Sequence, residues 1–460
     1  MVATRTEQAA QSHALPAPTR EMADWIAGLT HADITTQALT WAKHAVLDWL
    51  GVTIAGAHEP LSDILIADAL SEGAAGSAHL MGRPERTIPS QAALINGAAS
   101  HALDYDDVHL GLNGHPTAPM LPALLALAEQ RGSTGHEVLT AFIGAYEIEC
   151  CIAAMIGNSH YDDGWHNTAT IGTFGAAAAC CKLLGLDGPH TATALGIAAT
   201  QAAGLKAMFG TMCKPLHAGK AAYNGLLAAR LASRGFTSRT DALECSQGFA
   251  DTQSRAFQAL PIRPDPHAPY AVEANLFKYH AACYLTHSPI EAVAALRQAH
   301  QLTPGDVERI TLYVPHGHLN VCNIPAPATG LEVKFSLRHT AALALVGDDT
   351  AALDTYSDAI ANRPDLVALR DKVEVVTRSF PRQSPAAVAI TLRNGATVST
   401  TLDVGEPAQD LEAQWARLTH KFHSLVDPIL GTDAAHACID QCAALEAAMD
   451  LHTVLACASC

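Results

Sequence analysis

Side chains that could transfer a proton are concentrated in one short segment of this sequence. Between His101 and His115 the chain carries three aspartates and three histidines, and Pro116 follows. An imidazole and a carboxylate held close together can act as a general acid and base. Two plainer interpretations stay open. The segment could be a helix end with solvated acids, or a metal site, although its spacing matches no standard metal motif.

Two further segments offer groups that could bind an anion. His166 precedes a small-residue segment predicted to be a helix, and the positive end of a helix favours a bound anion. Thr168 could cap that helix. Lys214, His217 and Lys220 recur at every third residue where another helix is expected to begin, so they could share one side. The alternatives are an exposed loop histidine and a basic exposed turn.

A fourth segment, from Phe277 to Pro289, brings Lys278 close to the point where the sequence changes character. Ligand clefts tend to form between domains, although a linker with solvated charges would look similar. Together the four segments supply histidine and aspartate for proton transfer and lysine for holding carboxylates. This set suits removal of a proton next to a carboxylate, because cations neutralise the carboxylate while an acid/base pair moves the proton.

Signatures of cofactor binding are missing from the sequence. It has no glycine-rich dinucleotide or phosphate loop, no serine-hydrolase elbow and no His-Glu-x-x-His motif. The pairs Cys150-Cys151 and Cys180-Cys181 lie in apolar helical patterns and predict buried free thiols. The C-terminal cysteines, from Cys438 to Cys460, resemble a zinc knuckle only faintly, because no paired histidines accompany them. We therefore expect no metal and no organic cofactor.

Charge and hydropathy exclude several classes of partner. The formal net charge is −17 and no stretch is rich in lysine or arginine, so a nucleic-acid partner is not expected. No uninterrupted apolar run is long enough to span a bilayer, and residues 1–18 lack the apolar core of a secretory signal. We expect a cytoplasmic protein with no membrane partner and with residues 1–18 as a flexible tail.

Apolar periodicity predicts a mainly α fold with an α+β second domain. Helices are expected over 40–50, 120–129, 136–156, 168–184, 195–203 and 218–232, with 51–56 as a small-residue segment after the first. Strands are expected over 309–314, 373–377, 387–392 and 397–402, and Asn394-Gly395 predicts a hairpin between the last two. Helices over 289–299, 337–345 and 356–362 accompany these strands, and helices resume over 410–423 and 434–451. Residues 19–270 and 408–460 would form a helical domain, and residues 271–407 an α+β domain.

The four segments, in this order, resemble the MmgE/PrpD family. Four elements of that family have counterparts in this chain. They are an acidic segment followed by His-Pro, a loop histidine before a small-residue helix, a Lys-Pro-x-His-x-Gly element, and a lysine before the second domain. The counterparts are Asp104 to Asp107 with His115-Pro116, Gly164 to Gly175, Lys214 to Gly219, and Lys278 with His287-Ser288 beyond it. The segment from Asp48 to Gly56 fits as well, and the similarity covers nearly the whole chain.

The resemblance implies a large helical domain made from both chain ends, a smaller α+β lid domain, and usually a homodimer. It implies a pocket between the domains that needs no cofactor and is lined by Asp104, His115, His166, Lys214 and Lys278. His115 is the predicted general acid/base, with Asp104 as its polar partner or the complementary base. His166, Lys214 and Lys278 are predicted to hold carboxylates. His217 and Asp107 complete the predicted substrate-binding set, more as supports than as direct contacts.

Family members include 2-methylcitrate dehydratase, cis-aconitate decarboxylase and iminodisuccinate epimerase, whose substrates carry two or more carboxylates. The resemblance therefore implies a cofactor-independent lyase that acts on a small di- or tricarboxylate. Dehydration of the 2-methylcitrate type, a reaction of propionate catabolism, is the first expectation. Decarboxylation of the cis-aconitate type and epimerisation are the alternatives, and a non-catalytic carboxylate-binding protein is a further one.

Overall fold

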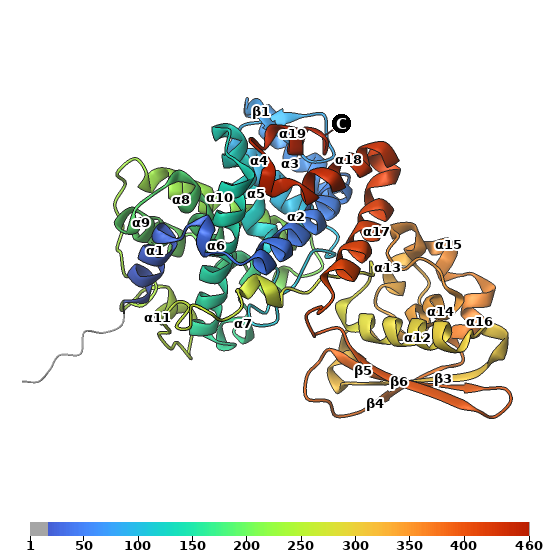
Figure 1. The fold of residues 1–460 in the computed structure, drawn as a ribbon. Coiled ribbons are helices and arrows are strands. Elements are labelled where there is room, and N and C mark those ends of the chain that lie inside the picture. The colour runs from blue at the N-terminus through green and yellow to red at the C-terminus, as the bar shows by residue number, and fades with distance from the viewer. Residues whose placement is uncertain (1–16, 460) are drawn as a thin grey trace, which may run out of the picture.

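The computed structural model describes residues 17–459 and shows a large helical body beside a smaller part that contains a β-sheet (Figure 1). The predicted fold class, mainly α with an α+β portion, is confirmed. The predicted tail, residues 1–18, lies almost wholly outside the described residues, and helix α1 already begins at Pro18.

The helical body takes elements from both ends of the chain. From the N-terminal side come α1 (Pro18–Gly28), α2 (Thr36–Gly56), α3 (Pro60–Ser71), β1 (Ala75–His79), β2 (Arg86–Thr87), α4 (Pro89–Ser100), α5 (Thr117–Arg131), α6 (Gly135–Ile156), α7 (Ser159–Asp162), α8 (Asn167–Leu184), α9 (Gly188–Ala199), α10 (Cys213–Ala232) and α11 (Phe249–Gln253). From the C-terminal side come α17 (Leu411–Leu430), α18 (Thr432–Ala443) and α19 (His452–Ala456).

Helix α17 returns the chain from the sheet to the helical body, where it packs on α2 (Figure 1). Its buried residues include Gln414, Leu418, Phe422 and Leu425, a spacing that forms one stripe along a helix. α18 also contacts α2, and α19 contacts α18. The two ends of the chain therefore meet in one body. The domain boundaries at residues 270 and 408 stay predictions.

The prediction that the helix over 40–50 gives way to a separate small-residue segment is wrong, because α2 continues to Gly56. Its glycines permit close packing instead of ending the helix. A Cβ atom on Gly51 would lie 2.9 Å from the ring of Phe422 in α17, and one on Gly56 would lie 2.0 Å from the carbonyl oxygen of Ala99 in α4. Small residues inside a helix can thus mark a helix crossing as well as a stop.

The second part combines a four-stranded sheet with helices on one face (Figure 1). Its elements are α12 (His287–His300), β3 (Val307–Val314), α13 (Gly330–Val333), α14 (Leu337–Val346), α15 (Asp358–Ala361), α16 (Pro364–Arg370), β4 (Val373–Thr377), β5 (Pro385–Leu392) and β6 (Thr397–Asp403). The strand order is β4-β3-β5-β6, with β3 and β4 parallel and the other pairs antiparallel. The hairpin predicted at Asn394-Gly395 joins β5 to β6.

Several predicted helices differ from the observed ones in extent, and others, such as α3 and α16, were not among the predicted helices. The segment predicted over 195–203 belongs to α9, which begins at Gly188 after an Asp187 cap. The segment predicted over 434–451 ends at Ala443, and α19 follows only at His452. Helix α4 was not predicted. Its residues from Ala92 to Ser100 are buried on nearly every side, so its sequence lacks the polar stripe that marks an amphipathic helix.

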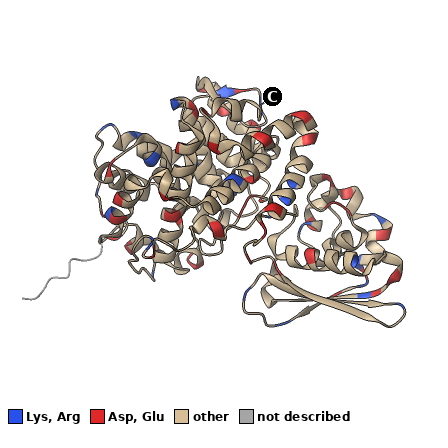
Figure 2. Cartoon of the chain, viewed as in Figure 1, with Lys and Arg blue, Asp and Glu red and all other residues tan. Residues whose placement is uncertain are grey.

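Helix α6 is, within residues 17–459, the one helix long and apolar enough to cross a bilayer, which differs from the expectation that no run is long enough. Of its most apolar window, 83% is buried inside the structure, which is the environment of a core helix. Acidic and basic residues are spread over both parts of the described chain in the view of Figure 2.

The cysteines inside the helical body are free thiols, as predicted for the two adjacent pairs. Cys180 and Cys181 are fully buried in α8, whereas Cys150 and Cys151 of α6 are only partly buried. Of the faint zinc-knuckle motif, Cys460 lies outside the described residues.

Candidate active site

The ends of three helices meet at the candidate site. Helices α4 and α10 cross so closely that a Cβ atom on Gly219 would lie 2.2 Å from the carbonyl oxygen of Leu94. Close to this crossing, α4 ends before His101 and α10 begins at Cys213, just before Lys214. Helix α8 begins at Asn167, directly after His166, as predicted. Lys278 enters from the segment that leads to the second part.

A pocket of about 300 Å³ lies where these ends converge, and all five residues predicted to line the site are in its wall. The lining consists of Asp104, Val108, His109, Leu110, Asn113, Gly114, His115, Tyr161, His166, Thr168, Phe209, Lys214, Lys278, Cys283 and Tyr284. Lys220 is not part of this wall, and its ammonium instead lies 4.4 Å from the ring centre of Tyr223.

Asp104 is the common partner of the site's cationic groups. Its Oδ1 lies 2.9 Å from Lys214 Nζ, 3.1 Å from Lys278 Nζ and 3.5 Å from His115 Nε2. Desolvation by the surrounding protein would raise the pKa of Asp104, whose side chain is still 50% exposed, but Lys278, Lys214 and His115 hold this pKa well below its usual range. Asp104 is therefore an anion that gathers these groups. Such a weak base fits the predicted role of polar partner better than that of complementary base.

The backbone at Asp104 is held in a left-handed conformation, with φ of +50°. Non-glycine residues adopt this region rarely, and surrounding contacts must fix it. Lys278 Nζ supplies one such contact, since it also donates to the Asp104 carbonyl oxygen at 2.5 Å.

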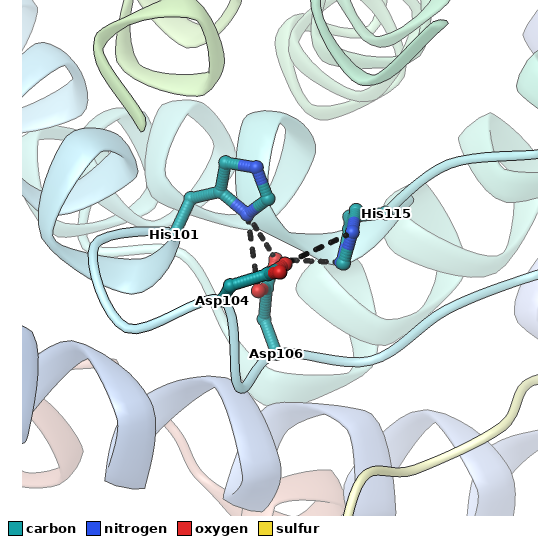
Figure 3. A group of neighbouring side chains, drawn as sticks. All are labelled: His101, Asp104, Asp106 and His115. Atoms are coloured by element: carbon teal, nitrogen blue, oxygen red, sulfur yellow. Dashed lines mark hydrogen bonds and ion pairs between the residues drawn. The ribbon is translucent and has the colours of Figure 1, made fainter. Parts of the chain in front are cut away.

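Asp106 lies between the imidazoles of His101 and His115 (Figure 3). Its Oδ2 is 2.9 Å from His101 Nδ1 and 3.2 Å from His115 Nδ1. Burial would raise the pKa of Asp106, but His101 and His115 hold it well below its usual range, so it stays ionised. Burial lowers the pKa of His101 to about 4. Asp106 was not predicted as a site residue, yet it is the buried carboxylate that orients the candidate acid/base.

His166 is only 2% exposed, so it is not a solvated loop histidine. Burial, with His101 and Lys214 nearby, lowers its pKa well below the usual range and keeps it neutral. His166 Nδ1 lies 3.2 Å from His217 Nδ1, and His217 is not in the pocket wall. The structure thus places His217 behind His166 as a support and not as a substrate contact.

The predicted capping role of Thr168 is wrong, because His166 occupies the N-cap of α8. The hydroxyl of Thr168 instead accepts a hydrogen bond from the backbone N–H of His115 at 3.0 Å. Thr168 therefore ties the loop that carries His115 to the start of α8.

Asp107 does not line the pocket, which contradicts direct contact with a substrate. It is 1% exposed, and its Oδ2 accepts hydrogen bonds from Thr117 Oγ1 at 2.5 Å and Asn275 Nδ2 at 2.7 Å. Burial, with Asp48 and Asp106 nearby, raises the pKa of Asp107 to about 7. The side chain points behind the pocket because its neighbours Asp104 and Asp106 take the sites beside the cationic groups.

Replacing Asp107 by asparagine is expected to flatten the dependence of stability on pH between about 4 and 7. The folded state keeps the Asp107 proton to a higher pH than the unfolded chain does, so the wild-type free energy of unfolding falls across this window. A pKa raised from 3.8 to about 7 corresponds to about 4 kcal/mol in all. Urea unfolding at several pH values would measure this. Identical pH dependence in both proteins would contradict it.

The group His101, Asp104, Asp106 and His115 has donor atoms that all lie within 4.8 Å of one another, so it could hold a metal ion (Figure 3). Both carboxylates of this group already have partners, however. Lys214 and Lys278 neutralise Asp104, and His101 bonds to Asp106. The arrangement therefore resembles a proton-transfer site more than an open cation site.

Comparison with known proteins agrees with this geometry. The MmgE/PrpD N-terminal domain model matches residues 20–260, and the C-terminal domain model matches residues 280–451. The chain belongs to the MmgE/PrpD family. The resemblance inferred from the four segments is thereby confirmed.

The relatives in this family are lyases. A cis-aconitate decarboxylase of Aspergillus terreus is 29% identical over 99% of this chain and 98% of the relative. A human cis-aconitate decarboxylase is 28% identical over 92% of this chain and 90% of the relative. A 2-methylcitrate dehydratase of Escherichia coli is 25% identical over 77% of each chain. These similarities support an enzyme of the lyase class.

Proposed function

We propose that this protein is a lyase acting on a small tricarboxylate, with decarboxylation of the cis-aconitate type as its reaction. The observation that carries the proposal is the pocket in which two lysines and one histidine converge on Asp104. Such a pocket can bind carboxylates and deliver a proton at the same place. The protein's net charge of −17 would repel an anion at a distance, so these local cations must provide the attraction.

Binding would use the ammonium groups of Lys214 and Lys278. Each retains N–H donors beyond those directed at Asp104, because an ammonium carries three. Both side chains are largely buried, at 16% and 3% exposure, which strengthens their attraction for a carboxylate. Neutral His166 can donate one further hydrogen bond from its ring. Two or three substrate carboxylates could thus be held in fixed positions.

Proton transfer would use His115. Its ring nitrogens lie 3.5 Å from Asp104 Oδ1 and 3.2 Å from Asp106 Oδ2, so the ring stands beside two carboxylates at the pocket wall. In a decarboxylation of cis-aconitate, the bond between the CH2 carbon and its carboxylate breaks, carbon dioxide departs, and the electron pair is shared with the adjacent double bond. The far carbon of this allylic system takes the proton from His115, so the double bond shifts and itaconate forms. In a dehydration, a base removes a proton next to a carboxylate and His115 protonates the departing hydroxyl.

The extent of similarity favours decarboxylation over the dehydration that the sequence analysis placed first. Cis-aconitate decarboxylases align with 92–99% of this chain, whereas the 2-methylcitrate dehydratase aligns with 77%. Dehydration of 2-methylcitrate stays the second candidate because that relative belongs to the same family. Epimerisation needs only proton exchange at one carbon, which the same residues could perform. A non-catalytic carboxylate-binding protein would have no use for His115 between two aspartates.

A proton NMR time course in D2O tests the proposal with cis-aconitate, 2-methylcitrate, citrate and iminodisuccinate as separate substrates. We expect cis-aconitate to lose carbon dioxide and give itaconate carrying one deuterium. New vinylic signals from 2-methylcitrate alone would replace decarboxylation by dehydration. Deuterium exchange without bond cleavage would indicate an epimerase. No change in any of the four would contradict the proposed lyase activity on these substrates.

A further inference from the structure

A buried ion pair joins the last part of the chain to the first, directly beneath the candidate site. Lys421 of α17 donates a hydrogen bond of 2.6 Å to Asp48 Oδ1 of α2. The two side chains are 2% and 1% exposed. Asp48 Oδ2 has no hydrogen-bond partner within the described residues. Two charges are therefore buried at the contact between these helices.

Lys421 also bonds to the loop that carries the carboxylates of the pocket. Its ammonium donates to the carbonyl oxygen of Tyr105 at 2.8 Å and lies 3.9 Å from the centre of the Tyr105 ring. Tyr105 stands between Asp104, whose backbone is left-handed, and Asp106, which orients His115. Lys421 thus anchors the peptide that separates the two carboxylates.

Helix packing alone does not explain this lysine. Apart from Gln414, which bonds to His44, the other large residues of the α17 stripe, Leu418, Phe422 and Leu425, are apolar. A buried ion pair adds little to stability compared with apolar residues of similar volume, because desolvation offsets the attraction. An apolar residue could not donate a hydrogen bond to the Tyr105 carbonyl oxygen, which would then be a buried acceptor without a partner.

Tyr105 extends this connection to the sheet-containing part. Its hydroxyl donates to the carbonyl oxygen of Ala351 at 3.3 Å. The residues next to Ala351 make further contacts. Asp349 accepts a hydrogen bond from the hydroxyl of Ser424 in α17, and the Thr350 carbonyl oxygen accepts one from the backbone N–H of Ala281. The same tyrosine is therefore fixed at its carbonyl by the helical body and at its hydroxyl by the second part.

We propose that Lys421, paired with Asp48, is a positioning residue that fixes Asp104 and Asp106 through the Tyr105 carbonyl, and that Tyr105 couples them to the second part. The effect on catalysis rests on the proposed function, whereas the effect on the loop does not. Lys421 touches no residue that is expected to contact substrate. Its removal should therefore loosen the loop and misalign the acid/base without removing a reacting group.

The test compares two charge-balanced double variants. In Asp48→Asn/Lys421→Met both buried charges are removed together, so no unpaired charge remains. Glu147→Gln/Arg263→Met is the matched control, because Arg263 and Glu147 form another largely buried pair, at 7% and 10% exposure, away from the pocket lining. Hydrogen exchange of the backbone amides in residues 102–108 is measured by mass spectrometry, together with the pH profile of kcat.

We expect exchange in residues 102–108 to become at least about 10-fold faster in Asp48→Asn/Lys421→Met and to stay unchanged in the control. On a substrate that the wild type turns over, kcat is expected to fall at least about 10-fold and its pH profile to shift, because Asp106 no longer holds His115 in place. Unchanged exchange in this loop, or a wild-type pH profile and kcat in a folded variant, would overturn the proposal.

Tyr105→Phe keeps the proposal testable if the double variant does not fold, since it removes only the hydroxyl that bonds to Ala351. Tyr270→Phe is its control, because the Tyr270 hydroxyl donates a similar bond to the Asp33 carbonyl at 2.9 Å, away from both the loop and Ala351. Faster exchange in residues 102–108 is expected for Tyr105→Phe alone, and equal exchange in both would overturn the coupling. A wild-type protein without turnover would contradict the proposed function, but the exchange result would still decide the role of Lys421.

Discussion

Replacing His115 by alanine is expected to lower kcat by about 10³-fold, the usual contribution of a positioned general acid or base. His115 is the residue of the pocket whose two ring nitrogens face two ionised carboxylates, Asp104 and Asp106. Without the ring, no group at this position can hand a proton to the substrate carbon. Steady-state rates on the substrate found by NMR would measure the loss, with KM changing much less than kcat.

His423→Ala provides the matched control. His423 also faces a carboxylate, with Nδ1 2.9 Å from Asp427 Oδ1, but it lies on α17 outside the pocket wall. Its removal should leave kcat unchanged. Circular dichroism would confirm that both variants keep their helices. A folded His115→Ala variant with a wild-type rate would remove His115 from the mechanism.

Replacing Lys214 by methionine is expected to raise KM by about 10- to 100-fold. A hydrogen bond to a charged group contributes about 1.5–3 kcal/mol when its partner is buried. The Lys214 ammonium is 16% exposed and lies at the pocket wall, so a substrate carboxylate would lose one such bond. Methionine preserves the length and the apolar stem of the side chain, which limits damage to α10.

Lys220→Met separates a local carboxylate contact from a general effect of charge. Lys220 lies on the same helix and occurs in the same three-residue spacing, but it is not in the pocket wall. Both variants lower the positive charge by one. Equal increases in KM in the two variants would show that Lys214 acts only through the overall field, contrary to the proposed contact.

The convergence of remote segments on one pocket could be predicted because each segment contains reactive residues where an apolar pattern breaks. His166 before a helix, Lys214 at a helix start and Lys278 at the change of character all have such a signal. The β5–β6 hairpin was predictable for a related reason, since Asn-Gly adopts the tight turn that joins two alternating strands.

The roles of neighbouring aspartates could not be assigned from sequence. Asp104, Asp106 and Asp107 lie in an irregular loop, where no periodicity tells which side chain faces which way. The left-handed backbone at Asp104 and the hydrogen bond from Lys421 to the Tyr105 carbonyl determine which way each side chain points. As a result Asp107, predicted in the substrate-binding set mainly as a support, lies behind the pocket, whereas Asp106, which was not predicted, lies beside His101 and His115.

The buried position of Lys421 does have a signal in the sequence. It falls within the stripe formed by Leu418, Phe422 and Leu425, so a charged residue occupies a core position of an amphipathic helix. A buried lysine requires a partner, and Asp48 lies in the apolar helix against which α17 packs. By contrast, the pocket walls formed by Phe209 and Tyr284 come from short 3-10 helical turns, whose positions depend on tertiary packing.

The most direct test of the account is the crystal structure of the His115→Asn variant with cis-aconitate, in which slow turnover would preserve the ligand. We expect substrate in the pocket beside Asp104, with carboxylates within hydrogen-bond distance of Lys214 Nζ and Lys278 Nζ and a substrate carbon facing residue 115. Cis-aconitate bound elsewhere, for example in the separate pocket between α17 and the end of β6, with both lysines still bonded only to Asp104, would contradict it.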